Sequence, residues 1–312
     1  MNPRAIDPRE GAPHQTLKIP RRPESSSRSG LATICLTQRY THDMLADRFR
    51  VNLFGCFTLP LREPTLVWIL WQRDLAQRYR GSYIGWGWTL LTPLLLLCVY
   101  VLIFQTVFSP RWSQRDDFVL QLFAGLMIVQ IFAEVLSRSP RLIIDQPHLV
   151  KKVVFPLPLL GWITSLSALF LGTIYLFFFL SAAALWHGLS WYALVAPLVL
   201  WLCLPMLLAA AWLFAALGTF VKDLQQVAGP LITLLSFLGP VFYPISALPS
   251  WLGAWVWFNP VTVPIESLRA CVLLAQAPNW ALLGAYAVVG GVLAAFSGFH
   301  FLRVQARFAD VL

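Results

Sequence analysis

Long runs of apolar residues dominate the chain from Gly85 onward, and they predict helices that cross a membrane. The runs lack the alternation of apolar and polar residues that strands show, and they are too long for barrel strands. A helix needs about 20 apolar residues to cross the hydrocarbon core of a bilayer. We therefore predict six transmembrane helices, of which the fifth is the shortest: Trp86–Phe108, Phe118–Leu136, Leu159–Leu180, Trp191–Phe220, Val227–Tyr243 and Trp280–Leu302.

A seventh apolar stretch, Trp251–Arg269, is interrupted by Pro260 and Pro264 and also contains Glu266. Such a stretch is more typical of a re-entrant or interfacial hairpin than of a span. Non-helical backbone at membrane depth must be buried in protein or face water. The predicted fold is thus an all-α integral membrane protein with a re-entrant segment before the last helix.

The segment before residue 64 has a different composition. Residues 21–30, RRPESSSRSG, are charged, rich in serine and without periodicity, which predicts disorder. We assign residues 1–63 to a disordered N-terminal extension and residues 64–312 to the membrane domain. The stretch from Met44 leads naturally into the membrane domain. Residues 1–43 are therefore either a dispensable leader before the true start or a real flexible tail.

Aromatic and polar residues separate onto two faces of a predicted helix between residues 68 and 80. One face holds Trp68, Trp71, Leu75 and Tyr79, and the other holds Arg73, Gln77 and Arg80. An amphipathic helix of this kind tends to lie in the plane of the lipid headgroups. We assign it the interfacial residues Trp71, Arg73, Arg78 and Arg80. The alternative is a plain juxtamembrane anchor with arginines that reach toward the headgroups.

Composition and charge support a membrane protein. Hydrophobic residues make up 58% of the chain and charged residues 12%, whereas soluble domains have about 25% charged residues. The net charge of +9 suggests contact with anionic lipid rather than with nucleic acid. Basic residues gather in alternate loops, which places both termini in the cytoplasm. The five scattered cysteines indicate neither a metal site nor a disulfide framework.

Glu134 is the notable charge within a predicted span. Arg138 follows four residues later, so a pair at the cytoplasmic end of the second span would satisfy Glu134. We favour this structural pairing over a proton-relay role.

Four stretches carry a resemblance to a known family. They are residues 73–95 (RDLAQRYRGSYIGWGWTLLTPLL), 146–156 (QPHLVKKVVFP), 220–244 (FVKDLQQVAGPLITLLSFLGPVFYP) and 257–269 (WFNPVTVPIESLR). In this order they resemble the type-2 ABC-transporter permeases that export polysaccharides such as O-antigen, teichoic acid or capsule. The resemblance covers about residues 60–312.

The resemblance implies a homodimeric permease of the bacterial inner membrane that moves a lipid-linked, O-antigen-like polysaccharide. The chain lacks the Gly-Lys pair of a phosphate-binding loop, so it is not the ATPase by that mechanism. We expect no cofactor in this chain, and the family pattern supplies two copies of a separate subunit that binds ATP and magnesium. The nearest alternative is the same fold exporting a small hydrophobic molecule or drug. A membrane glycosyl- or acyltransferase is remote, because we find no acid and base residues arranged for catalysis.

The resemblance also assigns roles to particular residues. Residues 145–152 are predicted to form a short coupling helix that docks on the ATPase, with Pro147 near its start and Pro156 after its end. The predicted ATPase-coupling residues are Gln146, His148, Leu149, Lys151 and Lys152. The alternative is that the two lysines only set membrane topology. The predicted channel aromatics are Tyr100, Phe104, Phe237 and Tyr243, because the family's channel uses the first and fifth spans; alternatively these side chains face lipid.

Overall fold

The described part of the chain is helical throughout. The computed structural model describes residues 53–78, Tyr83, Gly85, 87–106, 115–151, 155–186 and 188–308. No strand occurs among these residues, so the all-α prediction is confirmed for them.

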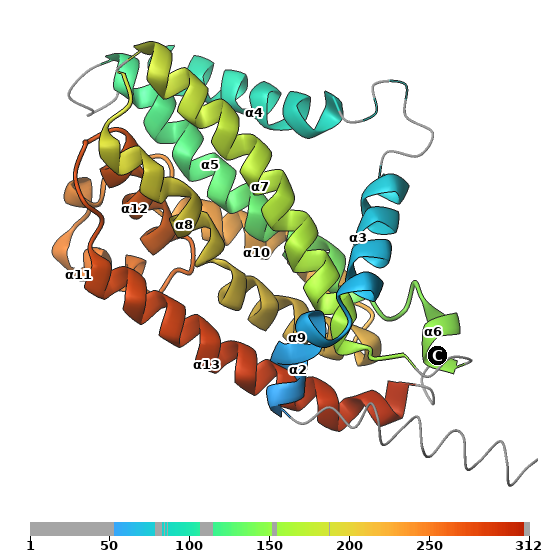
Figure 1. Ribbon diagram of the computed structural model, residues 1–312. Coiled ribbons are helices and arrows are strands. Elements are labelled where there is room, and N and C mark those ends of the chain that lie inside the picture. The colour runs from blue at the N-terminus through green and yellow to red at the C-terminus, as the bar shows by residue number, and fades with distance from the viewer. Residues whose placement is uncertain are drawn as a thin grey trace, which may run out of the picture. The chain divides into compact units, whose positions relative to one another are not determined.

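Four helical segments of the described chain are long and apolar enough to cross a bilayer. They are α5 (Arg115–Arg138), α7 (Pro158–Trp186), the segment Trp191–Phe220, and α13 (Trp280–Val304). The third comprises η2 (Trp191–Val195), α8 (Ala196–Trp201) and α9 (Leu204–Phe220). In Figure 1, α5 and α7 run side by side and α13 lies along α9. The second, third, fourth and sixth predicted spans are thereby confirmed as helices of membrane-spanning length.

The helices that correspond to the first and fifth predicted spans are not among these four. The helix α4 (Gly87–Thr106) occupies the position of the first, and α10 (Leu224–Leu238) occupies that of the fifth. With 15 residues, α10 is about 22 Å long, which is shorter than a hydrocarbon core of about 30 Å. The residue that follows its last turn is Gly239. A side chain there would clash, because an added Cβ would lie 2.7 Å from the Leu235 carbonyl oxygen. A total of six spans therefore stays a prediction.

The structure differs from the sequence prediction over residues 53–62. These residues form α2 (Leu53–Arg62), which packs on the bundle instead of belonging to a disordered extension. Cys56 and Leu59 are buried, and the Trp162 indole nitrogen donates a hydrogen bond of 2.8 Å to the Cys56 carbonyl. The physical reason is that this segment is apolar and covers one end of α7. Residues 1–52 lie outside the described residues.

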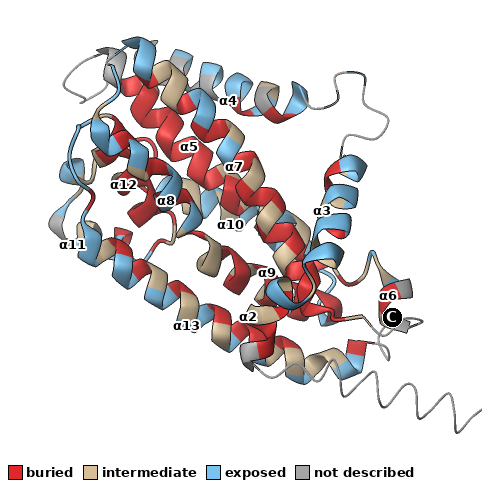
Figure 2. Cartoon of the chain, viewed as in Figure 1, coloured by how far each residue is buried: buried red, intermediate tan, exposed pale blue. Residues whose placement is uncertain are grey.

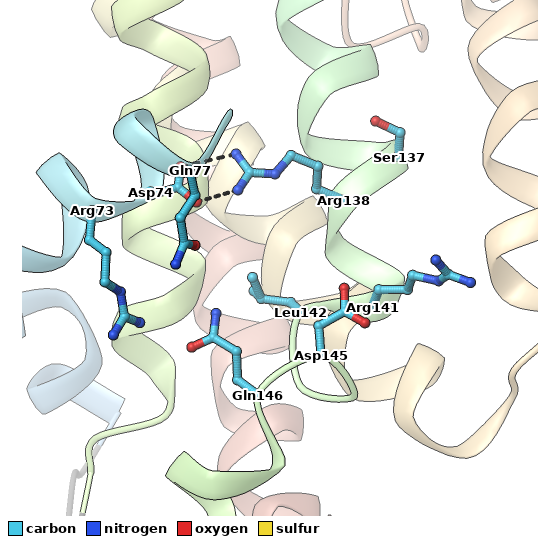
Figure 3. A pocket seen from close by; sticks show the side chains of 9 residues that line it. All are labelled: Arg73, Asp74, Gln77, Ser137, Arg138, Arg141, Leu142, Asp145 and Gln146. Carbon is cyan, nitrogen blue, oxygen red and sulfur yellow. Dashed lines mark hydrogen bonds and ion pairs between the residues drawn. The ribbon is translucent and has the colours of Figure 1, made fainter. Parts of the chain in front are cut away.

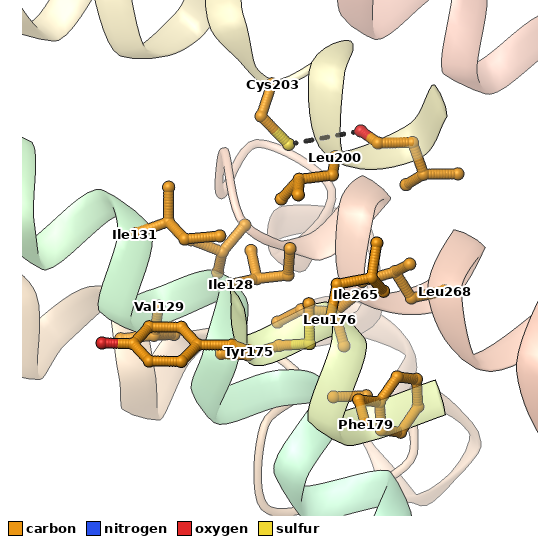
Figure 4. Close-up of a cluster of buried hydrophobic side chains, with 14 of the residues drawn as sticks. Ile128, Val129, Ile131, Tyr175, Leu176, Phe179, Leu200, Cys203, Ile265 and Leu268 are labelled. Carbon is orange, nitrogen blue, oxygen red and sulfur yellow. Dashed lines mark hydrogen bonds between the residues drawn. The ribbon is translucent and has the colours of Figure 1, made fainter. Parts of the chain in front are cut away.

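Two apolar clusters hold the bundle together. The larger joins α5, α7 and α8, and includes Ile128, Tyr175 and Leu200 (Figure 4). Figure 2 shows buried residues concentrated along α5, whereas α3 (Pro64–Arg78) and α13 have exposed outer faces.

The smaller cluster is centred on Trp212 of α9, which is fully buried. Its indole nitrogen donates a hydrogen bond of 2.9 Å to the Pro158 carbonyl. Gly161 and Gly298 lie against the ring, where an added Cβ would come within 2.5 Å and 3.1 Å respectively. Small residues at these contacts let α7, α9 and α13 approach closely, which is how helices associate in a bilayer that supplies little hydrophobic drive.

The interrupted segment before α13 forms two short helices. They are α11 (Ser250–Val256) and α12 (Thr262–Val272), and they follow the single turn η3 (Ile245–Ala247). Most of α12 is buried in the bundle. The break between α11 and α12 is observed, while a re-entrant or interfacial hairpin stays a prediction.

Gly218 of α9 offers a test of the packing beneath η1 (Ser139–Arg141). A Cβ at Gly218 would lie 2.3 Å from the Pro140 carbonyl oxygen, and backbone cannot move aside cheaply. We expect Gly218→Ala to destabilise the protein by about 1–3 kcal/mol, measured as a lower unfolding temperature in detergent. Gly284→Ala is the matched control, because an added Cβ there meets nothing within 4 Å. Equal unfolding temperatures for the two variants would contradict the observed contact.

Candidate functional site

Four charged side chains join α3 to the end of α5. Arg138 forms an ion pair with Asp74 and donates a hydrogen bond of 3.1 Å to its Oδ2 atom. Arg78 forms an ion pair with Glu134, whose Oε1 also accepts a hydrogen bond of 3.3 Å from Arg138. Ser167 of α7 donates a hydrogen bond of 2.7 Å to Asp74 Oδ2. These five residues, the α3–α5 ion network, tie three helices together.

The network follows from a shared spacing in the two helices. Asp74 and Arg78 are four residues apart on α3, and Glu134 and Arg138 are four residues apart on α5, so each pair lies on one helical face. The acid of each helix pairs with the base of the other, which requires the two helices to run antiparallel where they meet. The predicted Glu134–Arg138 pair is confirmed. Sequence reasoning missed Asp74, although its spacing to Arg78 repeats that of the predicted pair.

A polar cavity of about 400 Å³ opens beside the network (Figure 3). Its lining residues are Arg73, Asp74, Gln77, Ser137, Arg138, Arg141, Leu142, Asp145 and Gln146. The Oε1 atom of Gln146 is buried and has no hydrogen-bond partner among the residues that the structure describes. Leaving a buried acceptor unpaired costs about 1–3 kcal/mol, so a water or a donor from a partner fits against this wall.

A second buried charge, Arg269, binds the non-helical chain that follows α10. Arg269 is only 2% exposed, and it donates hydrogen bonds to the carbonyls of Gln121, Pro240 and Val241 at 2.6 to 3.2 Å. It also pairs with Glu266 at 3.0 Å. Arginine suits this position because its planar group carries five donors. One side chain thereby joins α12, α5 and the chain after α10.

Asn259 also binds backbone groups near the end of α10. Its Nδ2 atom donates a hydrogen bond of 2.9 Å to the Leu235 carbonyl, and its Oδ1 atom accepts one of 3.2 Å from the Val261 amide. The side chain therefore satisfies backbone groups at the end of α10 and just before α12. Asn259 lies in one of the four stretches that carry the family resemblance, and the sequence alone assigned it no role.

Comparison with known proteins identifies the family. A family model described as ABC-2 type transporter matches residues 65–273, which include the ion network, the polar cavity and the Arg269 contacts. The chain belongs to the ABC-2 type transporter family. It is therefore a multi-pass membrane protein and a transporter's membrane subunit, and the resemblance drawn from four sequence stretches is confirmed.

Curated relatives of this permease align over most of their length. An O-antigen export system permease protein RfbA of Myxococcus xanthus is 30% identical over 244 residues, which cover 77% of this chain and 92% of the relative. Two proteins of the same name from Klebsiella pneumoniae are each 26% identical over 251 residues, which cover 79% of this chain and 95% of theirs.

The predicted coupling segment of the permease contains the short helix α6 (Pro147–Lys151). Leu149, one of the predicted ATPase-coupling residues, lies inside the permease at 9% exposure and packs in the cluster with Ile143 and Leu159. It therefore secures α6 to the permease itself. The side chains of His148 and Lys151, and all of Lys152, lie outside the described residues.

The predicted interfacial residues of the permease occupy two environments. Arg73 is exposed beside the polar cavity, and the Trp71 ring packs edge-on against Phe170 of α7 at 5.3 Å. Arg78, expected among the lipid-facing arginines, is instead paired with Glu134. Arg80 lies outside the described residues.

Two of the predicted channel aromatics meet at the end of α10. Phe237 is exposed, and its carbonyl accepts a hydrogen bond of 2.8 Å from the Tyr243 hydroxyl. The side chains of Tyr100 and Phe104 lie outside the described part of the chain.

As for metal ions, no group of three His, Cys, Asp or Glu side chains gathers among the described residues.

The ion network predicts a specific energetic coupling. We expect Asp74→Asn and Arg138→Gln each to lower the unfolding temperature, because each leaves a partly buried charge without its partner, at about 1–3 kcal/mol. The double variant should lose less than the sum, with a coupling of about 0.5–3 kcal/mol. Arg141→Gln with Asp145→Asn is the control, since these exposed residues line the same cavity outside the network. Additive losses in the Asp74 and Arg138 cycle would contradict the network.

Proposed function

We propose that this chain is the permease of an ATP-driven exporter that moves a lipid-linked, O-antigen-like polysaccharide across the bacterial inner membrane. The observation that carries the proposal is the alignment with O-antigen export permeases over more than nine-tenths of their length. Both termini face the cytoplasm in this proposal, which rests on the alternation of basic loops.

Three further subunits of two kinds complete the proposed exporter. Two copies of a separate ATPase subunit bind ATP and magnesium, because the sequence has no Gly-Lys pair to hold phosphates. A second copy of this chain completes the path across the membrane.

The exposed faces of two helices support a path along α10. Every exposed residue of α13 between Trp280 and Phe299 is apolar, as a lipid-facing helix requires. By contrast, the exposed residues of α10 include Gln225, Gln226 and Thr233. Polar groups on a membrane helix are stable where they meet water or another polar surface. We therefore assign α10 to the polysaccharide path, with Phe237 offering an uncharged aromatic face to the passing sugars.

The proposed coupling route begins at α6 and ends at α3. An ATPase that displaces α6 would also move η1 and the end of α5, because these elements follow one another in the chain. The ion network would pass this displacement from Arg138 to Asp74, and hence to α3. The chain continues from α3 toward α4, the predicted first span. In this mechanism α3 and the end of α5 move as one body.

Deletion of the gene tests the proposed substrate. We expect deletion to abolish the surface polysaccharide and to accumulate its lipid-linked form inside the cell, and the wild-type gene to restore both. The measurement is surface polymer by gel or antibody, together with lipid-linked glycan in extracts. Normal surface polymer in the deletion strain would contradict the function.

Charge reversal tests the coupling segment. We expect Lys151→Glu with Lys152→Glu to reach the membrane at normal levels but to lose ATPase co-purification and export. Arg303→Glu with Arg307→Glu is the control, because it reverses two exposed charges at the other predicted cytoplasmic end. Wild-type binding and export in the lysine variant would place the ATPase contact elsewhere.

A further inference from the structure

A groove of about 470 Å³ lies between α3 and α7, apart from the polar cavity. Trp68 and Trp71 of α3, Phe170 and Thr173 of α7, and Trp201 of α8 contribute to its lining. On α3 the two tryptophans lie three residues apart, whereas Arg73 and Gln77 line the cavity on another face of the helix. The groove and the cavity are therefore separated by α3 itself.

The groove lies near the middle of the predicted span formed by α7, which favours a position in the hydrocarbon layer. Phe170 and Thr173 follow the start of α7 at Pro158 by 12 and 15 residues, which corresponds to about 18 to 22 Å along the helix. Trp68 and Trp201 are half exposed, at 56% and 50%. In a membrane protein, aromatic surface at this depth contacts lipid.

One polar atom in this apolar wall lacks a partner. The indole nitrogen of Trp71 is buried, and no described residue accepts a hydrogen bond from it. An unpaired donor costs several kcal/mol where water is absent. The groove lining offers one side-chain acceptor, the Thr173 hydroxyl, which also donates to the Leu169 carbonyl at 2.9 Å. A water needs two to four polar partners, so this lining holds a water poorly, and a carbonyl on an apolar ligand is an acceptor that fits.

Charged residues lie next to the groove lining in the chain. Pro60 and Pro64 line the groove, and the exposed Arg62 lies between them in the chain, followed by the half-buried Glu63. The Arg62 guanidinium is suited to pair with a phosphate. A single flexible chain fits the volume of the groove, since ligand pockets have about 300–1,000 Å³.

We propose that this groove binds a glycerophospholipid of the bilayer. One acyl chain lies against Phe170 and Trp201, an ester carbonyl accepts a hydrogen bond from Trp71 Nε1, and the phosphate faces Arg62. The bound lipid contacts both α3 and α7 and stabilises their packing. The ion network binds another face of α3 to the end of α5. The proposal does not depend on the identity of the exported substrate.

Lipid retention tests the hydrogen bond. Permease purified in mild detergent should retain about one phospholipid per chain, measured by native mass spectrometry and lipid extraction. Trp71→Phe keeps the aromatic ring and removes the donor, so we expect its affinity for added phosphatidylglycerol to fall about fivefold, the loss expected for one hydrogen bond. Trp191→Phe is the control, since Trp191 is 83% exposed on η2 and does not line the groove. No retained lipid in the wild type, or equal affinity in both variants, would overturn the proposal.

Photo-crosslinking tests the occupant itself. We replace Thr173 with p-benzoylphenylalanine and compare it with the same replacement at Val292, an exposed position on α13. The proposal requires a glycerophospholipid adduct at position 173 that persists after detergent washing, whereas the adduct at position 292 is lost. Three results would overturn it: a polyprenyl-lipid adduct, a peptide from another chain, or equal adduct loss at the two positions.

Discussion

Crosswise pairing of charges between α3 and α5 is the constraint on which the arrangement of α3, α5 and α7 in the permease depends. Partly buried charged groups are stable only when they are paired, and here Asp74 pairs with Arg138 and Glu134 pairs with Arg78. The pairing fixes both the direction of α3 against α5 and the level at which α3 lies. The Ser167 hydroxyl adds α7 to the same contact. The tryptophans of α3 are then placed against Phe170, and Arg73 and Gln77 line the polar cavity.

This arrangement gives α3 two supports of different chemistry. On one side the ion network holds it to the end of α5, from which the chain passes through η1 to α6. On another side its tryptophans line the proposed phospholipid groove. A helix held in this way can move with its neighbours without losing its buried charge pairs. The buried Arg269 and Asn259 act likewise at the other end of the bundle, where they hold the chain breaks around α10 and α12 to fixed backbone carbonyls.

Features that depend on local composition and spacing could be predicted from the sequence. Four spans follow from the length of apolar helix that a bilayer requires, and the Glu134–Arg138 pair follows from helical spacing. The Asp74–Arg138 pair was not predicted, because 64 residues separate its partners. The role of Arg269 was missed because its acceptors are mainly backbone carbonyls, which any residue supplies. The burial of Leu149 and the packing of α2 depend on neighbours far along the chain, so a short apolar segment does not reveal them.

The central claim is that α3 and the end of α5 move as one body when ATP is hydrolysed, and locking the two together tests it most directly. Gln77→Cys and Ser137→Cys, in an otherwise cysteine-free permease, place thiols on α3 and α5 at opposite sides of the cavity in Figure 3. A bifunctional maleimide then joins them in the assembled transporter, and export is measured before and after joining, with each single cysteine as control. The account predicts export unchanged by the cross-link. Loss of export on cross-linking, with full activity in the single-cysteine controls, would show that α3 and α5 must move apart and would contradict it.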